Sequence, residues 1–232
     1  MSDMEHGMAP PSQLDEAPVA TMPFAATPAD YESVYAEAHG QVDGVPWEDG
    51  RAHPALVNWL NVIAPSLIRC GSRVAVVGCG LGDDARELIK RGYDVTAFDC
   101  SQTAIKWARQ IDPENAHCYQ CADLFNPDPH WRHRFDLIVE VHTLQALTPT
   151  SQSLGLSAIA ELMSPHGHML VITEGAAEET PVTDGPPWPL TERSLREAAT
   201  QAGLAAEGGI TGFIDDGVDP PVHRIRALFR RA

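Results

Sequence analysis

The chain has 232 residues, which is enough for one α/β domain with a full hydrophobic core and too few for two comfortable ones. Hydrophobic residues make up 44% of the chain and charged residues 21%, which is ordinary for a globular protein in water. The formal net charge of −16 disfavours a nucleic-acid backbone as the partner.

The composition also bears on compartment and metal content. No stretch approaches the roughly 20 apolar residues of a membrane span, and the start Met1–His6 lacks the basic and apolar runs of a signal peptide. Five scattered cysteines are typical of a reducing cytoplasm, so we expect a cytoplasmic protein. Cys118 and Cys121 form a Cys-x-x-Cys pair without the second pair of a zinc site, and we expect buried structural cysteines and no metal.

The N-terminal part divides into an arm and a helical segment. Residues 1–28 are rich in proline and are expected to be a flexible arm. Tyr31, Val34, Tyr35 and Ala38 then recur at helical spacing behind a possible Asp30 cap. A second helix is expected around residues 54–63. We expect residues 29–232 to form a single domain, in which residues 29–66 make a helical lid.

Strand and helix patterns alternate through the rest of the chain. The expected strands cover residues 74–77, 95–99, 117–120, 135–141, 168–173, 205–214 and 222–230. Helical patterns follow the first, second, fourth and fifth of these, the last at residues 191–202 with Thr191 as its cap. This order predicts a doubly wound, mostly parallel, seven-stranded Rossmann-like sheet with a C-terminal antiparallel hairpin strand.

Residues 73–85 are the most informative stretch. Four buried-strand residues, 74–77, run directly into Gly78, Gly80 and Gly82, and helical spacing resumes at Ala85. Asp83 or Asp84 can cap that helix. A strand, a glycine turn and a helix start in this order indicate a site where the backbone presses against a ligand.

The spacing of the glycines discriminates between ligands. A dinucleotide fingerprint needs its third glycine at position 83, where this chain has Asp83. Asp83 and Asp84 at the helix start would also repel a pyrophosphate. A ligand that carries adenosine and a cationic amino-acid tail, such as S-adenosylmethionine, suits the turn better than NAD does.

A second acidic signal follows at the distance expected for a ribose contact. Asp99 ends the next buried strand about 20 residues after the turn, where a carboxylate meets the ribose hydroxyls of an adenosine ligand. Ser101 can then cap the following helix.

These motifs resemble those of the class I S-adenosylmethionine-dependent methyltransferases over about residues 30–232. The resemblance implies that the glycine turn binds the cofactor, Asp99 its ribose, Ala122-Asp123-Leu124 its adenine, and that the end of strand 135–141 lines the methyl-transfer site. Val76 stands where many members carry an acid, which leaves Glu140, Asp83 and backbone carbonyls as candidates for the cofactor's amino group. The expected cofactor-binding residues are Gly78, Cys79, Gly80, Gly82, Asp99, Cys100, Ala122, Asp123, Leu124 and Glu140.

Residues 45–54 and 140–147 resemble the thiopurine and small-thiol S-methyltransferase branch. Methyl transfer from a sulfonium is an in-line displacement that mainly needs alignment and exclusion of water. If a base is needed, His142 is the first candidate, with a polar helix cap as the alternative, and His39 and His53 come second. The expected substrate-binding residues are Tyr31, Tyr35, Trp47, His142 and Trp188, of which the two tyrosines equally fit the buried face of a helix.

These observations predict an enzyme that methylates a small molecule with S-adenosylmethionine, releasing S-adenosylhomocysteine, most simply at a thiol. An O- or N-methyltransferase of a small metabolite is the first alternative. An NAD-dependent dehydrogenase and a non-catalytic ligand-binding domain share the fold class. The sequence leaves the acceptor and the oligomeric state open.

Overall fold

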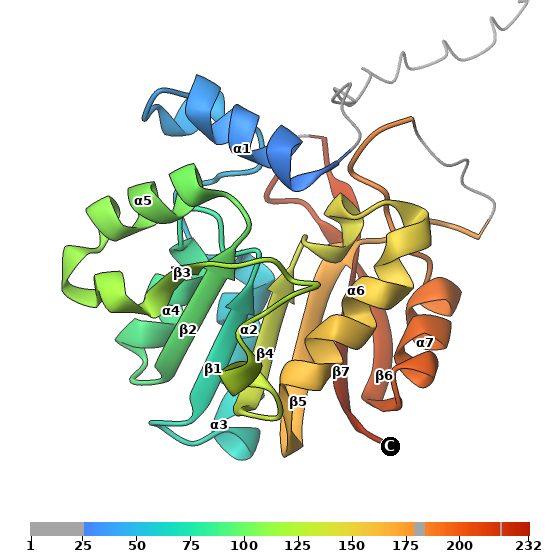
Figure 1. The fold of residues 1–232 in the computed structure, drawn as a ribbon. Helices are drawn as coiled ribbons and strands as arrows, with labels where there is room; N and C mark the ends of the chain where they lie inside the picture. The colour runs from blue at the N-terminus through green and yellow to red at the C-terminus, as the bar shows by residue number, and fades with distance from the viewer. Residues whose placement is uncertain (1–25, 179–183, 219) are drawn as a thin grey trace, which may run out of the picture.

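The computed structural model describes residues 26–178, 184–218 and 220–232, which form one sheet covered by helices (Figure 1). The strands are β1 (Arg73–Val77), β2 (Asp94–Asp99), β3 (Tyr119–Cys121), β4 (Phe135–Val141), β5 (Met163–Glu174), β6 (Leu204–Asp215) and β7 (Val222–Arg231). Their order is β3-β2-β1-β4-β5-β7-β6. Strands β1 to β5 pair in parallel, and β7 runs antiparallel to both of its neighbours. The doubly wound, mostly parallel seven-stranded sheet is therefore confirmed.

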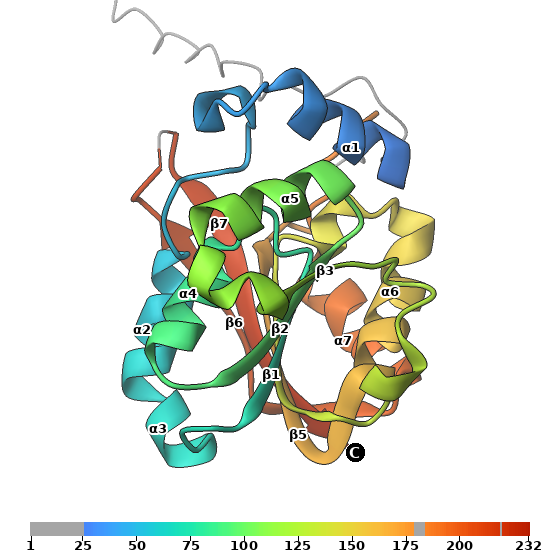
Figure 2. The same cartoon turned by 60° about the vertical axis from the view of Figure 1, so that its left-hand side comes forward.

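The helices form a layer on each face of the sheet (Figures 1 and 2). The α-helices are α1 (Pro28–Glu37), α2 (Pro54–Val62), α3 (Ala64–Leu67), α4 (Asp83–Lys90), α5 (Gln102–Ile111), α6 (Pro149–Leu162) and α7 (Glu192–Gln201). Short 3₁₀ helices are η1 (Val42–Gly44), η2 (Pro113–Cys118), η3 (Pro129–Trp131) and η4 (Leu144–Ala146). Helix α1 belongs to neither layer and lies across one end of the sheet, above α5. None of the described helices has the length and apolar character to cross a membrane.

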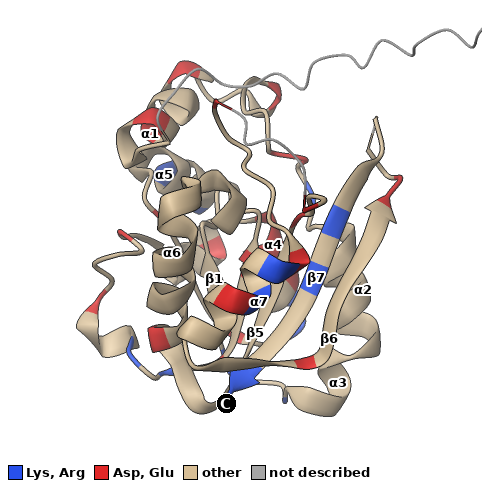
Figure 3. Ribbon diagram, turned by 90° about the vertical axis from the view of Figure 1, so that its right-hand side faces the viewer, with Lys and Arg blue, Asp and Glu red and all other residues tan. Residues whose placement is uncertain are grey.

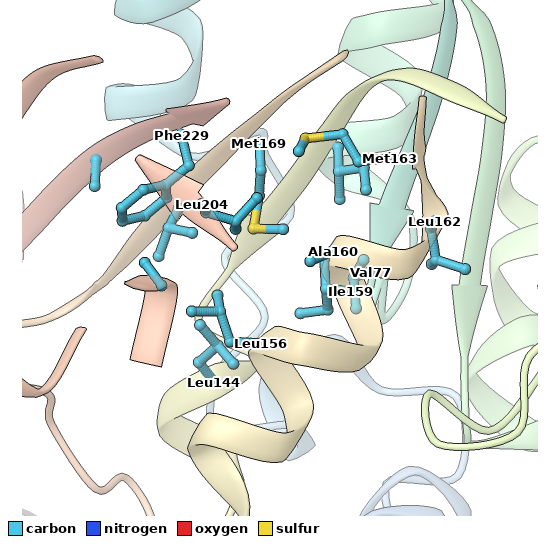
Figure 4. Close-up of a cluster of buried hydrophobic side chains, with 14 of the residues drawn as sticks. Val77, Leu144, Leu156, Ile159, Ala160, Leu162, Met163, Met169, Leu204 and Phe229 are labelled. Carbon is cyan, nitrogen blue, oxygen red and sulfur yellow. The ribbon is translucent and has the colours of Figure 1, made fainter. Parts of the chain in front are cut away.

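Each face of the sheet carries its own hydrophobic core. Val74 and Val76 face α2, α4 and α5, whereas Ala75 and Val77 face the other way. The second core joins α6 and α7 to β4, β5 and β7 around side chains such as Leu156 and Ile159 (Figure 4). A strand buried on both faces reads as a continuous apolar run, which explains the pattern of residues 74–77.

The sheet reverses its strand order at β1, because β2 lies on one side of β1 and β4 on the other. Val77 at the end of β1 pairs with Phe98 of β2 and Glu140 of β4. The carboxyl ends of the three strands therefore meet at one edge. Ligands of open α/β sheets bind at such a switch point.

Helix caps follow the sequence signals only in part. Ser101 and Thr191 cap α5 and α7 as expected. The cap of α1 is Thr27 and not Asp30, because Asp30 instead accepts the Thr27 backbone N–H in a reciprocal capping box. The N-cap of α4 is Gly82, in the left-handed region, so neither Asp83 nor Asp84 is its cap.

Two strand boundaries also differ from expectation. Strand β3 starts at Tyr119, because Pro113 begins a 3₁₀ helix that runs to Cys118. Cys118 is buried but Cys121 is exposed, so the expectation of two buried cysteines was wrong for Cys121. Strand β5 starts at Met163 rather than at residue 168, since an irregularity in the pairing with β4 lets the chain rejoin the sheet earlier.

Candidate functional site

The glycine turn connects β1 to α4 at the switch point of the sheet. Gly78, Gly80 and Gly82 have φ values of 60°, 50° and 86°, which L side chains rarely adopt. A Cβ at Gly80 would overlap the Glu48 carboxylate, and one at Gly78 would overlap the Thr143 side chain. Glycine is therefore required here both by backbone conformation and by the close approach of neighbouring groups.

Asp99 ties the end of β2 to this turn. One oxygen, Oδ2, accepts the Gly80 N–H at 3.0 Å, and Oδ1 accepts the Ser101 N–H at 2.9 Å. The side chain is only 8% exposed, and burial raises the pKa of its carboxyl. Asp99 lies where the sequence placed a ribose contact, and it also holds the glycine turn against β2.

The expected adenine segment follows β3 beside Asp99. Cys121 pairs with Asp99 across the sheet, and the Ala122 N–H donates to the Asp99 carbonyl at 3.0 Å. Leu124 packs into the core next to Ala122. The Asp123 carboxylate accepts the Phe125 N–H at 2.9 Å, so it stabilises its own turn.

Two segments cover this edge of the sheet. One is helix α1, and the other is residues 45–50, which we call the strap. Glu32 of α1 accepts hydrogen bonds from the Ser101 hydroxyl and from the Thr103 N–H at the start of α5. At its other side, Tyr31 Oη donates to the Ala146 carbonyl of η4 at 2.6 Å. The hydrogen bonds of α1 thus link α5 to η4, and the helix lies across one end of the sheet (Figures 1 and 2).

The aromatic residues of this cover are clustered. The Trp47 ring lies edge-on to the rings of Tyr31 and Tyr35, each at a centroid distance of 5.7 Å. Tyr35 is 3% exposed and packs with Leu81 of the glycine turn. The structure therefore brings Tyr31, Tyr35 and Trp47 together. Trp188 is 7% exposed, and its backbone N–H donates to the Gln145 carbonyl of η4 at 2.7 Å, next to the carbonyl that binds Tyr31.

Sequence reasoning missed Glu48, the strap carboxylate. Its Oε1 accepts the Leu81 N–H and the Tyr35 hydroxyl, each at 3.0 Å. Burial, with a smaller contribution from Asp83 and Asp99, raises the pKa of Glu48 to about 7. The Trp-Glu-Asp-Gly sequence of residues 47–50 was visible, but nothing in its spacing placed it on the glycine turn.

Glu140 and Asp83 are the two acidic candidates for the cofactor's amino group, and Oε2 of Glu140 is buried without a hydrogen-bond partner among the described residues. Glu140 is fully buried, and its Oε1 accepts the Leu144 N–H at 2.8 Å. Burial raises the pKa of Glu140 to about 8. Asp83 forms an ion pair with Arg86 within α4. Glu140 thus fixes the turn after β4, and Asp83 is neutralised in place.

His142 follows β4 directly, with a left-handed φ of 64°. Its Nε2 accepts a hydrogen bond from Nη1 of Arg224 at 2.8 Å, because the guanidinium can only donate. Burial, then the charges of Arg224 and His53, lower the pKa of His142 well below its ordinary value. A protonated ring would lie against the guanidinium, so these surroundings oppose the expected role of His142 as a general base.

Arg224 of β7 organises the polar cluster around His142, and sequence reasoning did not single it out. Basic residues lie along β7 (Figure 3), and Arg224 among them is 6% exposed. Its Nε donates to Oδ2 of Asp215 at 2.6 Å. The His53 ring lies edge-on to His142 at 5.0 Å, and burial lowers the pKa of His53 to about 4. A groove of about 340 Å³ opens beside His53 and Asp215. No three His, Cys, Asp or Glu side chains in the described part of the chain gather as a metal site.

Comparison with known proteins agrees with this geometry. Residues 76–169 match the family described as "Methyltransferase domain". The tRNA N(3)-cytidine methyltransferase METTL2 of Danio rerio is 28% identical over 108 residues, which cover 43% of this chain and 31% of that protein. The ubiquinone biosynthesis O-methyltransferase of Bradyrhizobium diazoefficiens is 29% identical over 106 residues, or 44% of this chain and 40% of that protein. The chain thus spans less than half the length of these two curated relatives.

Solved structures match over much more of the chain. The 1,6-didemethyltoxoflavin-N1-methyltransferase of Burkholderia thailandensis, with bound S-adenosylhomocysteine, has a TM-score of 0.69 at 19% identity and covers 94% of this chain and 93% of its own. A structure described for the conversion of a disulfide bond into a thioacetal group during echinomycin biosynthesis has a TM-score of 0.69 at 22% identity, covering 87% and 93%. Residues 76–169 are thus similar to a methyltransferase domain, and the chain has the fold of these solved structures.

Proposed function

We propose that this protein transfers the methyl group of S-adenosylmethionine to a small molecule. The observation that carries the proposal is the Gly78–Gly82 turn at the switch point, linked to the buried Asp99 carboxylate and covered by α1 and the strap. An NAD-dependent dehydrogenase would need a third glycine at position 83, where this chain has Asp83.

In this proposal, different residues of the chain bind different parts of the cofactor. The Asp99 carboxylate binds the ribose hydroxyls, while Cys100 and Ala122–Leu124 line the adenine. The turn with Gly78, Cys79, Gly80 and Gly82 holds the amino-acid tail. When bound, the cofactor supplies an electrophilic methyl on a sulfonium, and α1 with the strap excludes water from it.

The acceptor side favours a nucleophile that loses its proton without help. Nε2 of His142 already accepts the Arg224 N–H, and His53 is a weak base because its pKa is about 4. Thiols deprotonate more readily near neutral pH than alcohols do, so thiol S-methylation is the first choice. The structure associated with thioacetal formation is also consistent with sulfur chemistry in this fold.

Other acceptors follow from the relatives. The toxoflavin N-methyltransferase and the ubiquinone O-methyltransferase make a nitrogen or oxygen of a small metabolite the first alternative. One relative acts on tRNA, but a formal net charge of −16 opposes nucleic acid as the partner here. Five free cysteines support a reducing, cytoplasmic location.

The proposal is tested by measuring S-adenosylhomocysteine formation against a panel of thiols, phenols and amines. We expect turnover with at least one thiol and a lower rate with phenols and amines of the same size. Turnover confined to phenols or amines would reject the thiol assignment alone. The absence of both turnover and cofactor binding would reject the proposed function.

A further inference from the structure

The strap places a carboxylate directly on the glycine turn. Glu48 Oε1 accepts hydrogen bonds from the Leu81 N–H and the Tyr35 hydroxyl, each at 3.0 Å. Trp47 Nε1 in turn donates to Tyr35 Oη at 2.8 Å. The carboxylate is thus held by α1, by the strap and by the turn itself. It lies directly on the turn, where a ligand bound to the turn would contact it.

The charges around the turn are unbalanced. Asp83 and Asp99 both lie close enough to Glu48 to add to the effect of burial in raising the pKa of its carboxyl. Arg86 is the cation that the structure describes at this turn, and it is engaged by Asp83 and by the Leu81 carbonyl. Such a site favours a ligand that brings its own positive charge.

Resting on the proposed function, we infer that Glu48 binds the α-ammonium of S-adenosylmethionine. The carboxylate that many relatives carry two residues before the first glycine is Val76 here, which has no charge. Asp83 is paired with Arg86, and Asp99 is assigned to the ribose. Glu140 keeps one oxygen without a partner among the described residues but is completely buried, which leaves Glu48 as the carboxylate that the strap places on the turn. The contact also explains why α1 and the strap close over this edge, since Glu48 joins them to the tail of the cofactor.

This contact links cofactor binding to proton release. The groups that face Glu48 are Tyr35 of α1, Cys79 and Asp83 beside the turn, and Asp99 of β2. Without a ligand Glu48 has a pKa of about 7, and it is therefore partly protonated at pH 7. An ammonium beside it lowers that pKa, so binding expels the proton, and affinity increases as the pH rises through 7.

The test is calorimetry of S-adenosylhomocysteine binding at pH 7 in phosphate and in Tris, whose ionisation enthalpies differ. S-adenosylhomocysteine keeps the ammonium and is not turned over. We expect the unmodified protein to release a fraction of a proton, because Glu48 is partly protonated at pH 7. Glu48→Gln should release none and should bind about tenfold to a hundredfold more weakly. Asp49→Asn, which changes an exposed carboxylate of the same strap, should match the unmodified protein.

A second ligand separates a lost contact from a lost fold. Methylthioadenosine keeps the adenosine and the thioether but has no ammonium, so Glu48→Gln should bind it as the unmodified protein does. Equal S-adenosylhomocysteine affinity and equal proton release in Glu48→Gln would overturn the inference while the proposed function stood. An equal loss of affinity for both ligands would assign Glu48 to the fold of the turn and would also overturn it. Failure of the unmodified protein to bind either ligand would instead reject the proposed function.

Discussion

The cofactor side and the acceptor side of this site are built in different ways. On the cofactor side, Gly80 and the Asp99 carboxylate that binds its N–H are 19 residues apart and belong to adjacent strand–turn units. On the acceptor side, His142 and Arg224 are 82 residues apart and meet because β7 returns antiparallel beside β5. The first arrangement needs only local strand and helix signals, whereas the second depends on the complete topology of the sheet.

The two sides also differ in what their charges can do. Three carboxylates surround the glycine turn, and Arg86 is committed to one of them. The acceptor side instead pairs Arg224 with Asp215 and with a neutral His142. The negative charge around the glycine turn therefore attracts a cationic cofactor. On the acceptor side the charge of Arg224 is balanced by Asp215.

The largest expected effect comes from removing the cover of the cofactor side. Deletion of residues 1–48 removes Tyr35, Trp47 and Glu48, and we expect methyl transfer to fall to background because the reacting groups are open to water. Circular dichroism should still show the folded sheet. Deletion of residues 1–20 is the control and should retain the full rate. Wild-type transfer by a folded protein lacking residues 1–48 would show that the cover is not a lid.

Asp99→Ala tests one contact on the cofactor side. A carboxylate that accepts two ribose hydroxyls contributes about 1.5–3 kcal/mol, so the affinity for S-adenosylhomocysteine should fall by about one to two decades. Asp99→Asn keeps one acceptor oxygen for the Gly80 N–H and should lose less. Unchanged affinity in a folded Asp99→Ala protein would restrict Asp99 to bracing the glycine turn.

Glu140→Gln distinguishes a buried brace from a cofactor ligand. With a folded pKa of about 8, against an ordinary 4.5, the folded state keeps its proton as the pH rises through this window while the unfolded chain loses it. The stability contributed by Glu140 is therefore complete below pH 4.5 and is lost progressively toward pH 8. Glutamine does not titrate, so thermal melts should show stabilisation of up to about 3 kcal/mol at pH 7. Cofactor affinity should not change, and a tenfold loss would return Glu140 to the cofactor site.

The smallest expected effect is on the acceptor side. His142→Asn should lower kcat/KM by less than about tenfold and leave the pH–rate profile in place, because Nε2 of His142 already accepts the Arg224 N–H and its lowered pKa makes the ring a weak base. A general base would cost about 10²–10⁴ in rate. A loss of that size together with a missing basic limb would restore His142 as the base.

The features that could be predicted from the sequence lie mostly on the cofactor side. The apolar run at residues 74–77, the glycine spacing and the Asp99 position are short-range features, and the structure places all of them as expected. The Ser101 and Thr191 caps were equally local. Strand β3 was misplaced because the 3₁₀ turn beginning at Pro113 overrode a short apolar pattern.

The residues that the sequence did not assign act over long distances. Glu48 reaches Leu81 across 33 residues, and the Arg224–His142 contact fixes the state of an imidazole that looked like a base. Neither contact produces a periodic pattern in the sequence, because each depends on where a loop or an antiparallel strand lies in the fold. The same holds for Glu140, whose position at the end of β4 was expected but whose complete burial was not.

The central claim is that the glycine turn binds S-adenosylmethionine and not a dinucleotide. Calorimetry of the full chain with each ligand tests it most directly. We expect binding of S-adenosylmethionine at micromolar strength and no heat of binding with NAD, because Asp83 stands where a dinucleotide turn needs its third glycine. Micromolar binding of NAD without binding of S-adenosylmethionine would contradict the account.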